Sequence, residues 1–124
     1  MQQITLTSKL ENRGHYVPGM ISGDKLYISG QLPVHHETGS PMADSIEQQT
    51  RDALHNVERV LLAAGCTKED VVLCRVYIPD VAAWDTVNAV YAAFFGNHKP
   101  ARVIVPTREL HNGARIEIEA IAEL

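Results

Sequence analysis

Residues 45–65, SIEQQTRDALHNVERVLLAAG, decide how the rest of the chain must fold. Their apolar residues recur every three or four positions, which places them on one face of an α-helix. Asp44 or Ser45 can cap the start of this helix, and Gly65 can adopt the left-handed conformation that ends it. The apolar residues are Ile46, Ala53, Leu54, Val57, Val60, Leu61 and Ala64. An amphipathic helix of this kind needs a surface to cover.

A β-sheet can provide that surface. In the segments before and after the helix, apolar residues alternate with polar ones, as they do in strands. Before the helix, Gln3–Thr5 is expected as a short edge strand, and Tyr16–Ile21 pairs with Lys25–Ser29 across the turn at residues 22–24. The proline- and glycine-bearing segment Pro33–Ala43 is a loop.

After the helix, Val71–Ile78 is predicted as a strand whose core-facing row is Val72, Cys74, Val76 and Ile78. A second helix runs from about Val81 to Phe95 and ends at Gly96. Its buried stripe is predicted to be Trp84, Val87, Tyr91 and Phe94. Ala101–Val105 and Arg115–Leu124 are the last two strands.

The resulting order, β-β-β-α-β-α-β-β, indicates an α+β fold in one domain covering residues 1–124. Two helices can cover only one face of the sheet. The second row of the strand at 71–78, with Val71, Leu73 and Tyr77, is partly apolar. We therefore expect copies of the chain to cover the other face for one another.

Composition narrows the function classes. The chain has 124 residues, a net charge of −4 and scattered Lys and Arg, which argues against a nucleic-acid partner bound by charge alone. No apolar stretch approaches the length of a membrane span or a secretory leader. Cys66 and Cys74 are expected to be free thiols. These features predict a cytoplasmic protein without membrane contact.

Several catalytic motifs are absent from the sequence. It contains no phosphate-binding G-x-x-x-x-G-K loop, no G-x-G-x-x-G and no C-x-x-C. His35-His36-Glu37 is the densest cluster of metal-ligand residue types, and we predict a solvated surface turn there rather than a metal site. Cys66 and Cys74 are expected to be buried apolar side chains rather than nucleophiles.

Two sites in the sequence place glycine or charged residues at the ends of predicted strands, where the fold alone does not require them. Ser29-Gly30-Gln31 ends a strand, where the glycine allows either a simple turn or a close approach of the backbone to another group. Arg102 heads an apolar strand, and a buried charge requires a partner. That partner can be an internal carboxylate, Glu117 or Glu119, or the carboxylate of a ligand. The residues alone leave both possibilities open.

Four segments in order give the chain a recognisable pattern. They are GHYVPGMISGDKLYISGQLP (14–33), IEQQTRDALHNVERVLLAAG (46–65), VNAVYAAFFGNHKPAR (87–102) and RIEIEAIA (115–122). With these segments the chain resembles the Rid (YjgF-like) family. The resemblance implies a chorismate-mutase-like fold of the bacillar type, assembled as a homotrimer with three clefts between subunits.

The resemblance also implies an activity and its residues. Family members hydrolyse 2-iminopropanoate and 2-iminobutanoate, the imine forms of reactive enamine acids, to 2-oxo acids and ammonia. The implied partners are thus small 2-imino and 2-oxo carboxylic acids, and no metal or organic cofactor is expected. Arg102 matches the family arginine that binds the substrate carboxylate, and Glu117 matches the acid that helps to position the attacking water.

Other family positions map onto the walls of the cleft. Tyr16 and Ser29 match residues that line it, and the backbone at Gly30 and Ile104 would add contacts. Trp84 stands where the family usually has Phe.

The sequence departs from the family at residues 14–18, at Val103-Ile104 and at residues 110–113. These departures bear on substrate preference. Two alternative functions stay open. One is a trimer that binds a small carboxylate without turnover. The other is a ribonuclease, which the acidic charge balance disfavours.

Overall fold

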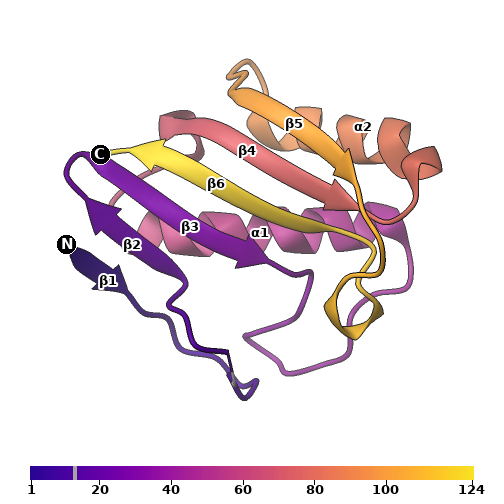
Figure 1. The fold of residues 1–124 in the computed structure, drawn as a ribbon, viewed down its shortest axis with the longest axis horizontal. Helices are drawn as coiled ribbons and strands as arrows, with labels where there is room; N and C mark the ends of the chain where they lie inside the picture. The colour runs from indigo at the N-terminus through magenta and orange to yellow at the C-terminus, as the bar shows by residue number, and fades with distance from the viewer. Residues whose placement is uncertain (13) are drawn as a thin grey trace.

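The computed structural model describes residues 1–12 and 14–124, which form a six-stranded sheet and two α-helices (Figure 1). This confirms the predicted α+β class and the order β-β-β-α-β-α-β-β. The elements are β1 (Gln2–Ile4), β2 (Gly19–Ser22), β3 (Lys25–Gln31), α1 (Ile46–Ala63), β4 (Val71–Ile78), α2 (Trp84–Phe95), β5 (Ala101–Pro106) and β6 (Glu117–Glu123). Short 3₁₀ turns at Lys68–Asp70, Val81–Ala83 and His111–Gly113 join them.

The strands lie in the order β1-β2-β3-β6-β4-β5. All neighbouring pairs are antiparallel except β4 and β5, which run parallel. Parallel neighbours need a crossover connection, and α2 provides it. β5 therefore lies at an edge of the sheet with α2 packed beside it, and this arrangement positions Arg102.

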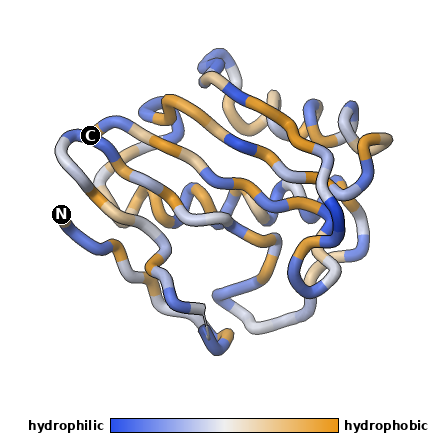
Figure 2. The backbone as a smooth tube through the Cα atoms, viewed as in Figure 1, coloured by the Kyte–Doolittle hydropathy of each residue, from blue (hydrophilic) through white to orange (hydrophobic). Residues whose placement is uncertain are grey.

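Both helices lie on the same face of the sheet, behind it in the view of Figure 1. The core forms between that face and the helices. From α1 it takes Leu54, Val57 and Leu61, which are fully buried together with Ile116 and Ile118 near and in β6. Figure 2 shows hydrophobic residues recurring along α1 and the central strands between hydrophilic ones. The opposite face of the sheet has no helix over it in the described chain.

Helix α1 begins and ends where its sequence predicts. Ser45 is the N-cap, and its hydroxyl accepts a hydrogen bond of 3.1 Å from the backbone N–H of Gln48. Gly65 follows the helix with a φ of +81°, a conformation that glycine adopts at little cost. These local interactions set where the helix begins and ends.

The predicted core row of β4 is wrong at its first residue. Val72 is 43% exposed, whereas Val71 is 2% exposed and belongs to the core. The pairing of β4 with β6 shifts register between Val71 and Leu73. Such a β-bulge inserts one residue and reverses the faces before it. Cys74, Val76 and Ile78 are buried as predicted.

The second helix also differs from its prediction. Residues 81–83 form a 3₁₀ turn, and α2 itself begins at Trp84. Its buried residues are Val87, Val90, Tyr91 and Phe95, whereas Trp84 is 39% exposed. The helix ends at Gly96 as predicted, where φ is +64°.

Two strand boundaries lie later than the sequence indicates. β2 begins at Gly19 rather than Tyr16, because Pro18 interrupts the strand pairing and offers only its carbonyl, which accepts from the N–H of Ser29 at 2.9 Å. β6 begins at Glu117 rather than Arg115, whose N–H donates to the side-chain oxygen of Gln49 on α1.

The loop after β3 is held on α1 by polar contacts. The amide of Asn56, only 2% exposed, donates to the carbonyls of Leu32 and Val34 at 2.8 and 2.9 Å. His35 contacts Asp52 at 2.9 Å. The His35-His36-Glu37 segment is thus a surface turn in which Glu37 is exposed, as predicted, whereas the two histidines are half-buried and His35 is bonded to the helix.

We expect Asn56→Ala to lower the free energy of unfolding by about 2 kcal/mol, because two backbone carbonyls lose their donor. Urea unfolding at one fixed protein concentration measures the change. Gln48→Ala, an exposed polar residue on the same helix, is the control and should cost about 0.5 kcal/mol or less. Equal losses in the two variants would contradict the anchoring role of Asn56.

Candidate functional site

Arg102 lies in β5 with its side chain turned toward the helices. Its Nη1 donates a hydrogen bond of 2.9 Å to the side-chain oxygen of Asn88. The central carbon of its guanidinium lies 4.7 Å from the ring centre of Tyr91 and 5.5 Å from that of Trp84. Both distances are within the range of cation–π attraction. The charged group is therefore surrounded by an amide and two aromatic rings.

These three partners all come from α2, and the helical repeat explains why they meet at one point. Trp84, Asn88 and Tyr91 are spaced by four and three residues, which places them along one stripe of the helix. The stripe faces β5 because α2 connects β4 to β5. Asn88 is the polar member between two aromatic ones.

The sequence left open whether Arg102 pairs with an internal carboxylate. Within the described residues, no Asp or Glu forms an ion pair with it. A guanidinium has five N–H donors, and the structure shows one of them in use, toward Asn88. The remaining donors match the two oxygens of a carboxylate.

A second cluster lies where β3 ends and β6 begins. A Cβ atom added to Gly30 would lie 2.6 Å from Oε2 of Glu117, closer than real Cβ contacts allow. The register of β3 and β6 shifts between Ile28 and Gln31, which brings this glycine against the carboxylate. Of the two readings of Ser29-Gly30-Gln31, the structure supports the close approach of the backbone to another group.

Burial raises the pKa of Glu117, and repulsion from Glu119 raises it further, while His111 opposes the shift. Glu119 itself accepts a short hydrogen bond from the Tyr77 hydroxyl and lies 3.7 Å from Arg75. No hydrogen bond holds the Glu117 carboxylate within residues 1–12 and 14–124. Of the two glutamates, Glu117 is therefore the one whose carboxylate can act on another molecule.

Ser29 precedes Gly30 in β3, and Tyr16 lies in the segment before β2. The Ser29 hydroxyl donates to the carbonyl of Val17 at 2.6 Å, which fixes the segment before β2 against the end of β3. Tyr16 lies one residue away in that segment with 58% of its surface exposed. The residues before β2 are thus held beside the end of β3, where the Glu117 carboxylate meets Gly30.

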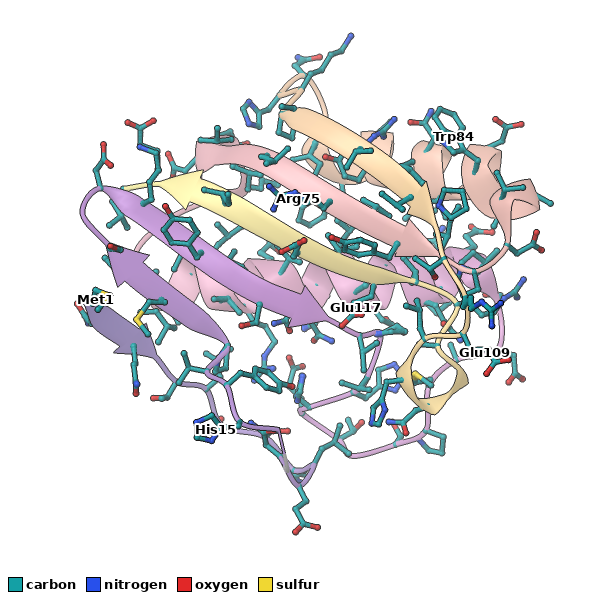
Figure 3. All side chains as sticks on the ribbon, in the orientation of Figure 1. Met1, His15, Arg75, Trp84, Glu109 and Glu117 are labelled. Carbon is teal, nitrogen blue, oxygen red and sulfur yellow. The ribbon has the colours of Figure 1, made fainter. Side chains whose placement is uncertain are left out.

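The two clusters lie on opposite faces of the sheet. Arg102 and Ile104 pair with Cys74 and Val76, whose side chains are fully buried on the helix side. Glu117 lies between Ile116 and Ile118, which are also buried there, so its own side chain points the other way. In Figure 3, Glu117 lies beside the end of β3 and Trp84 lies on α2 beyond β5. One chain alone does not bring the clusters together.

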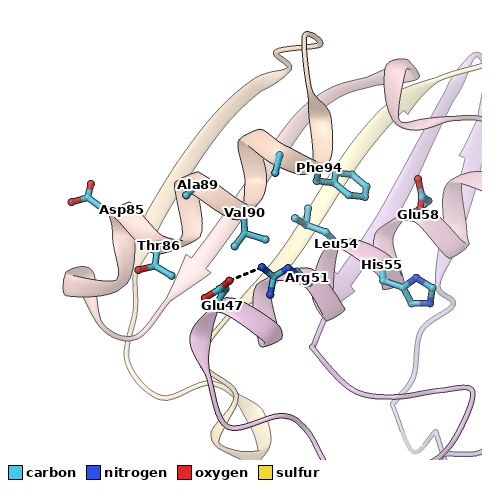
Figure 4. A pocket seen from close by; sticks show the side chains of 11 residues that line it. Glu47, Arg51, Leu54, His55, Glu58, Asp85, Thr86, Ala89, Val90 and Phe94 are labelled. Atoms are coloured by element: carbon cyan, nitrogen blue, oxygen red, sulfur yellow. Dashed lines mark hydrogen bonds and ion pairs between the residues drawn. The ribbon is translucent and has the colours of Figure 1, made fainter.

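A groove between the two helices, α1 and α2, contains none of these residues. It has a volume of about 790 Å³ (Figure 4), with Leu54, Val90 and Phe94 in its lining. The Glu47–Arg51 ion pair lies at its edge. A smaller cavity of about 80 Å³ lies between the loop after β3 and α1. Neither cavity offers the combination of guanidinium and free carboxylate.

The described residues also bear on three other possibilities, namely a metal site, a reactive thiol and a membrane-spanning helix. No three His, Cys, Asp or Glu side chains gather there in a way that could hold a metal ion. Cys66 and Cys74 are free and buried, as predicted, and burial raises the pKa of the Cys74 thiol to about 11. A thiol of that pKa is a poor nucleophile near neutrality. No described helix has the length and apolar character to cross a lipid bilayer.

Sequence reasoning missed the role of α2 beside Arg102. Tyr91 was predicted as core and Asn88 was not singled out. One pattern could have identified Asn88, since it lies four residues after Trp84 and three before Tyr91, a polar residue on a stripe otherwise aromatic.

The fold and the two clusters define a small α+β protein with an arginine at a sheet edge, free of carboxylate partners among the described residues, and a half-buried glutamate on the opposite face. The family model described as Endoribonuclease L-PSP matches residues 6–124. The chain belongs to this family, which confirms its resemblance to Rid (YjgF-like) proteins and its chorismate-mutase-like fold.

Individual relatives are similar over most of their length. A RutC family protein of Saccharolobus solfataricus is 40% identical over 124 residues, covering 99% of this chain and 98% of its own. The 2-iminobutanoate/2-iminopropanoate deaminase of Escherichia coli K12 is 42% identical over 112 residues, covering 88% and 87%. The crystal structure of E. coli TdcF with bound serine superposes with a TM-score of 0.93 at 33% identity, covering 100% and 99%.

We expect Gly30→Ala to displace the Glu117 carboxylate while leaving the fold intact, because the atom in contact is the end of a side chain that can rotate. The displaced carboxylate becomes more hydrated, so its raised pKa should fall toward the ordinary value for glutamate. Carboxyl NMR titration measures this pKa, and thermal unfolding checks the fold. An unchanged Glu117 pKa in a folded variant would show that the glycine is not needed for the carboxylate.

Proposed function

We propose that this protein hydrolyses small 2-imino acids, such as 2-iminopropanoate and 2-iminobutanoate, to 2-oxo acids and ammonia. The observation that supports this most directly is the Arg102 guanidinium, which is oriented by neutral groups and has no carboxylate partner in the described chain. A substrate carboxylate would complete it by two charge-assisted hydrogen bonds.

The site in this proposal forms between two copies of the chain. Arg102 and Glu117 point from opposite faces of one sheet, so a substrate touching both needs Arg102 of one copy and Glu117 of a neighbour. The sheet face without a helix carries half-buried Leu73, Tyr77 and Ile121, which a neighbour would cover. We propose a homotrimer with such a cleft at each junction.

Within the cleft, the chemistry needs few groups. Arg102 would hold the carboxylate, with Trp84 and Ile104 on the same side. Glu117 would accept a proton from a water as its oxygen bonds to the imine carbon. Glu117 would then return this proton to the nitrogen of the carbinolamine. The C–N bond breaks and ammonia leaves, while the hydroxyl loses its proton to water and becomes the carbonyl of the 2-oxo acid. Ser29, Gly30 and Tyr16 would form the wall beside Glu117.

The named activity of the E. coli deaminase, 42% identical to this chain, supports the reaction. The serine in E. coli TdcF supports a cleft suited to small amino-acid-like carboxylates. The proposal needs no metal or organic cofactor, since a protonated imine carbon is already electrophilic. It places the protein in the reducing cytoplasm, which its two unpaired, buried cysteines support.

The decisive experiment generates the imine in the assay. A dehydratase that uses pyridoxal phosphate acts on serine or threonine, and the rate of pyruvate or 2-oxobutanoate formation is followed with and without this protein. The proposal expects faster release of the 2-oxo acid. If release is not accelerated while 2-oxobutanoate still protects the protein against heat, the chain is a carboxylate-binding protein instead.

Arg102→Ala should lower kcat/KM for imine hydrolysis by about a hundredfold or more, because two charge-assisted hydrogen bonds to the carboxylate are lost. Arg102→Lys should be nearly as inactive, since a lysine cannot form the planar fork. Steady-state kinetics measure both, and thermal unfolding confirms that the variants fold. Undiminished activity of Arg102→Ala would rule out the carboxylate-binding role.

Glu117 predicts the pH dependence. Its pKa is raised by burial, so the basic form that accepts a proton is lost at a higher pH than for an ordinary glutamate. As the pH is lowered, we expect kcat to begin to fall at a pH higher than the ordinary pKa of a glutamate. Glu117→Gln should be nearly inactive without this limb. Glu123→Gln, an exposed residue of the same strand, should keep it.

Stability gives an independent readout of the same group. A carboxyl whose pKa is higher in the folded state binds protons more tightly there, so its ionisation destabilises the fold as pH rises. Glu117→Gln should therefore be more stable than the wild type near neutral pH. This difference in stability should shrink when the pH falls below the pKa that the Glu117 carboxyl has in the unfolded chain. A loss of stability at neutral pH would contradict the raised pKa.

A further inference from the structure

We propose that Asn88 is a positioning residue for Arg102. It supplies a neutral acceptor that orients the guanidinium and leaves its positive charge available to a ligand carboxylate. The inference rests on the proposed function in one respect, namely that Arg102 is the group that binds the carboxylate.

The geometry shows that Asn88 fixes one end of the guanidinium. Its side-chain oxygen accepts from Nη1 of Arg102 at 2.9 Å, and this contact is part-buried. Trp84 and Tyr91 lie on either side of Asn88 along α2 and place their rings within 5.5 and 4.7 Å of the guanidinium carbon. A hydrogen bond at one end and two ring contacts together restrict the rotation of the planar group.

Tyr91 contributes to this arrangement only through its ring. Its hydroxyl is buried beside the Cys74 thiol and makes no hydrogen bond to Arg102 within the described residues. Asn88 is therefore the polar contact that α2 makes with Arg102 in this part of the chain, and the specific orientation of the guanidinium depends on it.

The charge of the acceptor matters as much as its position. Arg51, Arg59 and Arg75 each lie within ion-pair distance of a glutamate, Glu47, Glu37 and Glu119 respectively. A carboxylate beside Arg102 would likewise pair with it and would compete with any incoming carboxylate. Asparagine has nearly the shape of aspartate and accepts the same hydrogen bond without cancelling the charge. The amide thus does what a carboxylate in the same place could not.

Two substitutions at this position separate charge from shape. Asn88→Asp keeps the acceptor and the shape but adds a negative charge, whereas Asn88→Ala removes the acceptor and leaves the charge unchanged. Thr86→Asp is the control, since it adds the same charge to the same helix on the side that lines the α1–α2 groove. Binding of 2-oxobutanoate by calorimetry, imine hydrolysis and thermal unfolding are measured for each.

We expect Asn88→Asp to weaken 2-oxobutanoate binding by more than about tenfold, and by more than Asn88→Ala does, because an ion pair removes the charge that the ligand needs. In kinetics the effect should appear mainly in KM for both variants. Asn88→Asp should unfold at a temperature at least as high as Asn88→Ala, because the new pair is local and favourable. Thr86→Asp should bind and turn over like the wild type.

This order of effects is opposite to that of a merely structural residue, for which the isosteric Asp would be tolerated better than Ala. The inference would be overturned if Asn88→Asp bound 2-oxobutanoate as tightly as the wild type. It would also be overturned if Asn88→Asp and Asn88→Ala lost binding equally and both variants were unfolded.

The same data distinguish this inference from the proposed function. If the wild type binds 2-oxobutanoate with the predicted order of variants but does not hydrolyse imines, the positioning role holds and the proposed activity fails. If the wild type hydrolyses imines and Asn88→Asp matches it, the activity holds and the positioning role fails. Absence of any carboxylate binding by the wild type would overturn both.

Discussion

The structure depends on one constraint, the burial of two amphipathic helices against a single face of the sheet. The apolar stripe of α1 and most of the buried face of α2 lie against that side, where Leu54, Val57 and Val87 are fully buried. A sheet covered on one face only has to leave its other face to solvent or to another molecule. The positions of Arg102 and Glu117 follow from this division, since each strand residue points either toward the helices or away from them.

The division explains why the proposed site is spread over two places. Arg102 points toward the helices at an edge strand, where α2 surrounds it with rings and an amide. Glu117 points to the open face at the end of β3, where Gly30 leaves room for its carboxylate. Within one chain, Arg102 and Glu117 therefore cannot form an ion pair with each other.

Much of the fold could be predicted because its determinants are local. The cap at Ser45, the glycine at position 65 and the helical repeat of α1 act within a few residues, and the structure confirms them. The bulge that moves Val71 into the core could not be predicted, because it depends on how β4 pairs with β6. Alternation within one strand contains no information about its partner's register.

The candidate site divides in the same way. The unusual positions of Arg102 and Glu117 were visible in the sequence, as was the glycine between Ser29 and Gln31. Their partners were not, because Asn88 meets Arg102 through the crossover from β4 to β5, across fourteen positions of the chain. Only the packed structure shows that Glu119 is already engaged by Tyr77 and Arg75 and that Glu117 is not.

The contact between Gly30 and Glu117 has a consequence for how this protein can change over time. The space that a methyl group would occupy at residue 30 is filled by a carboxylate from another strand. The two positions are therefore energetically coupled, and neither can be exchanged freely while the other stays the same. A larger residue at position 30 would therefore turn the acid at position 117 out of its present place, so the glycine preserves the position of the carboxylate rather than the fold itself.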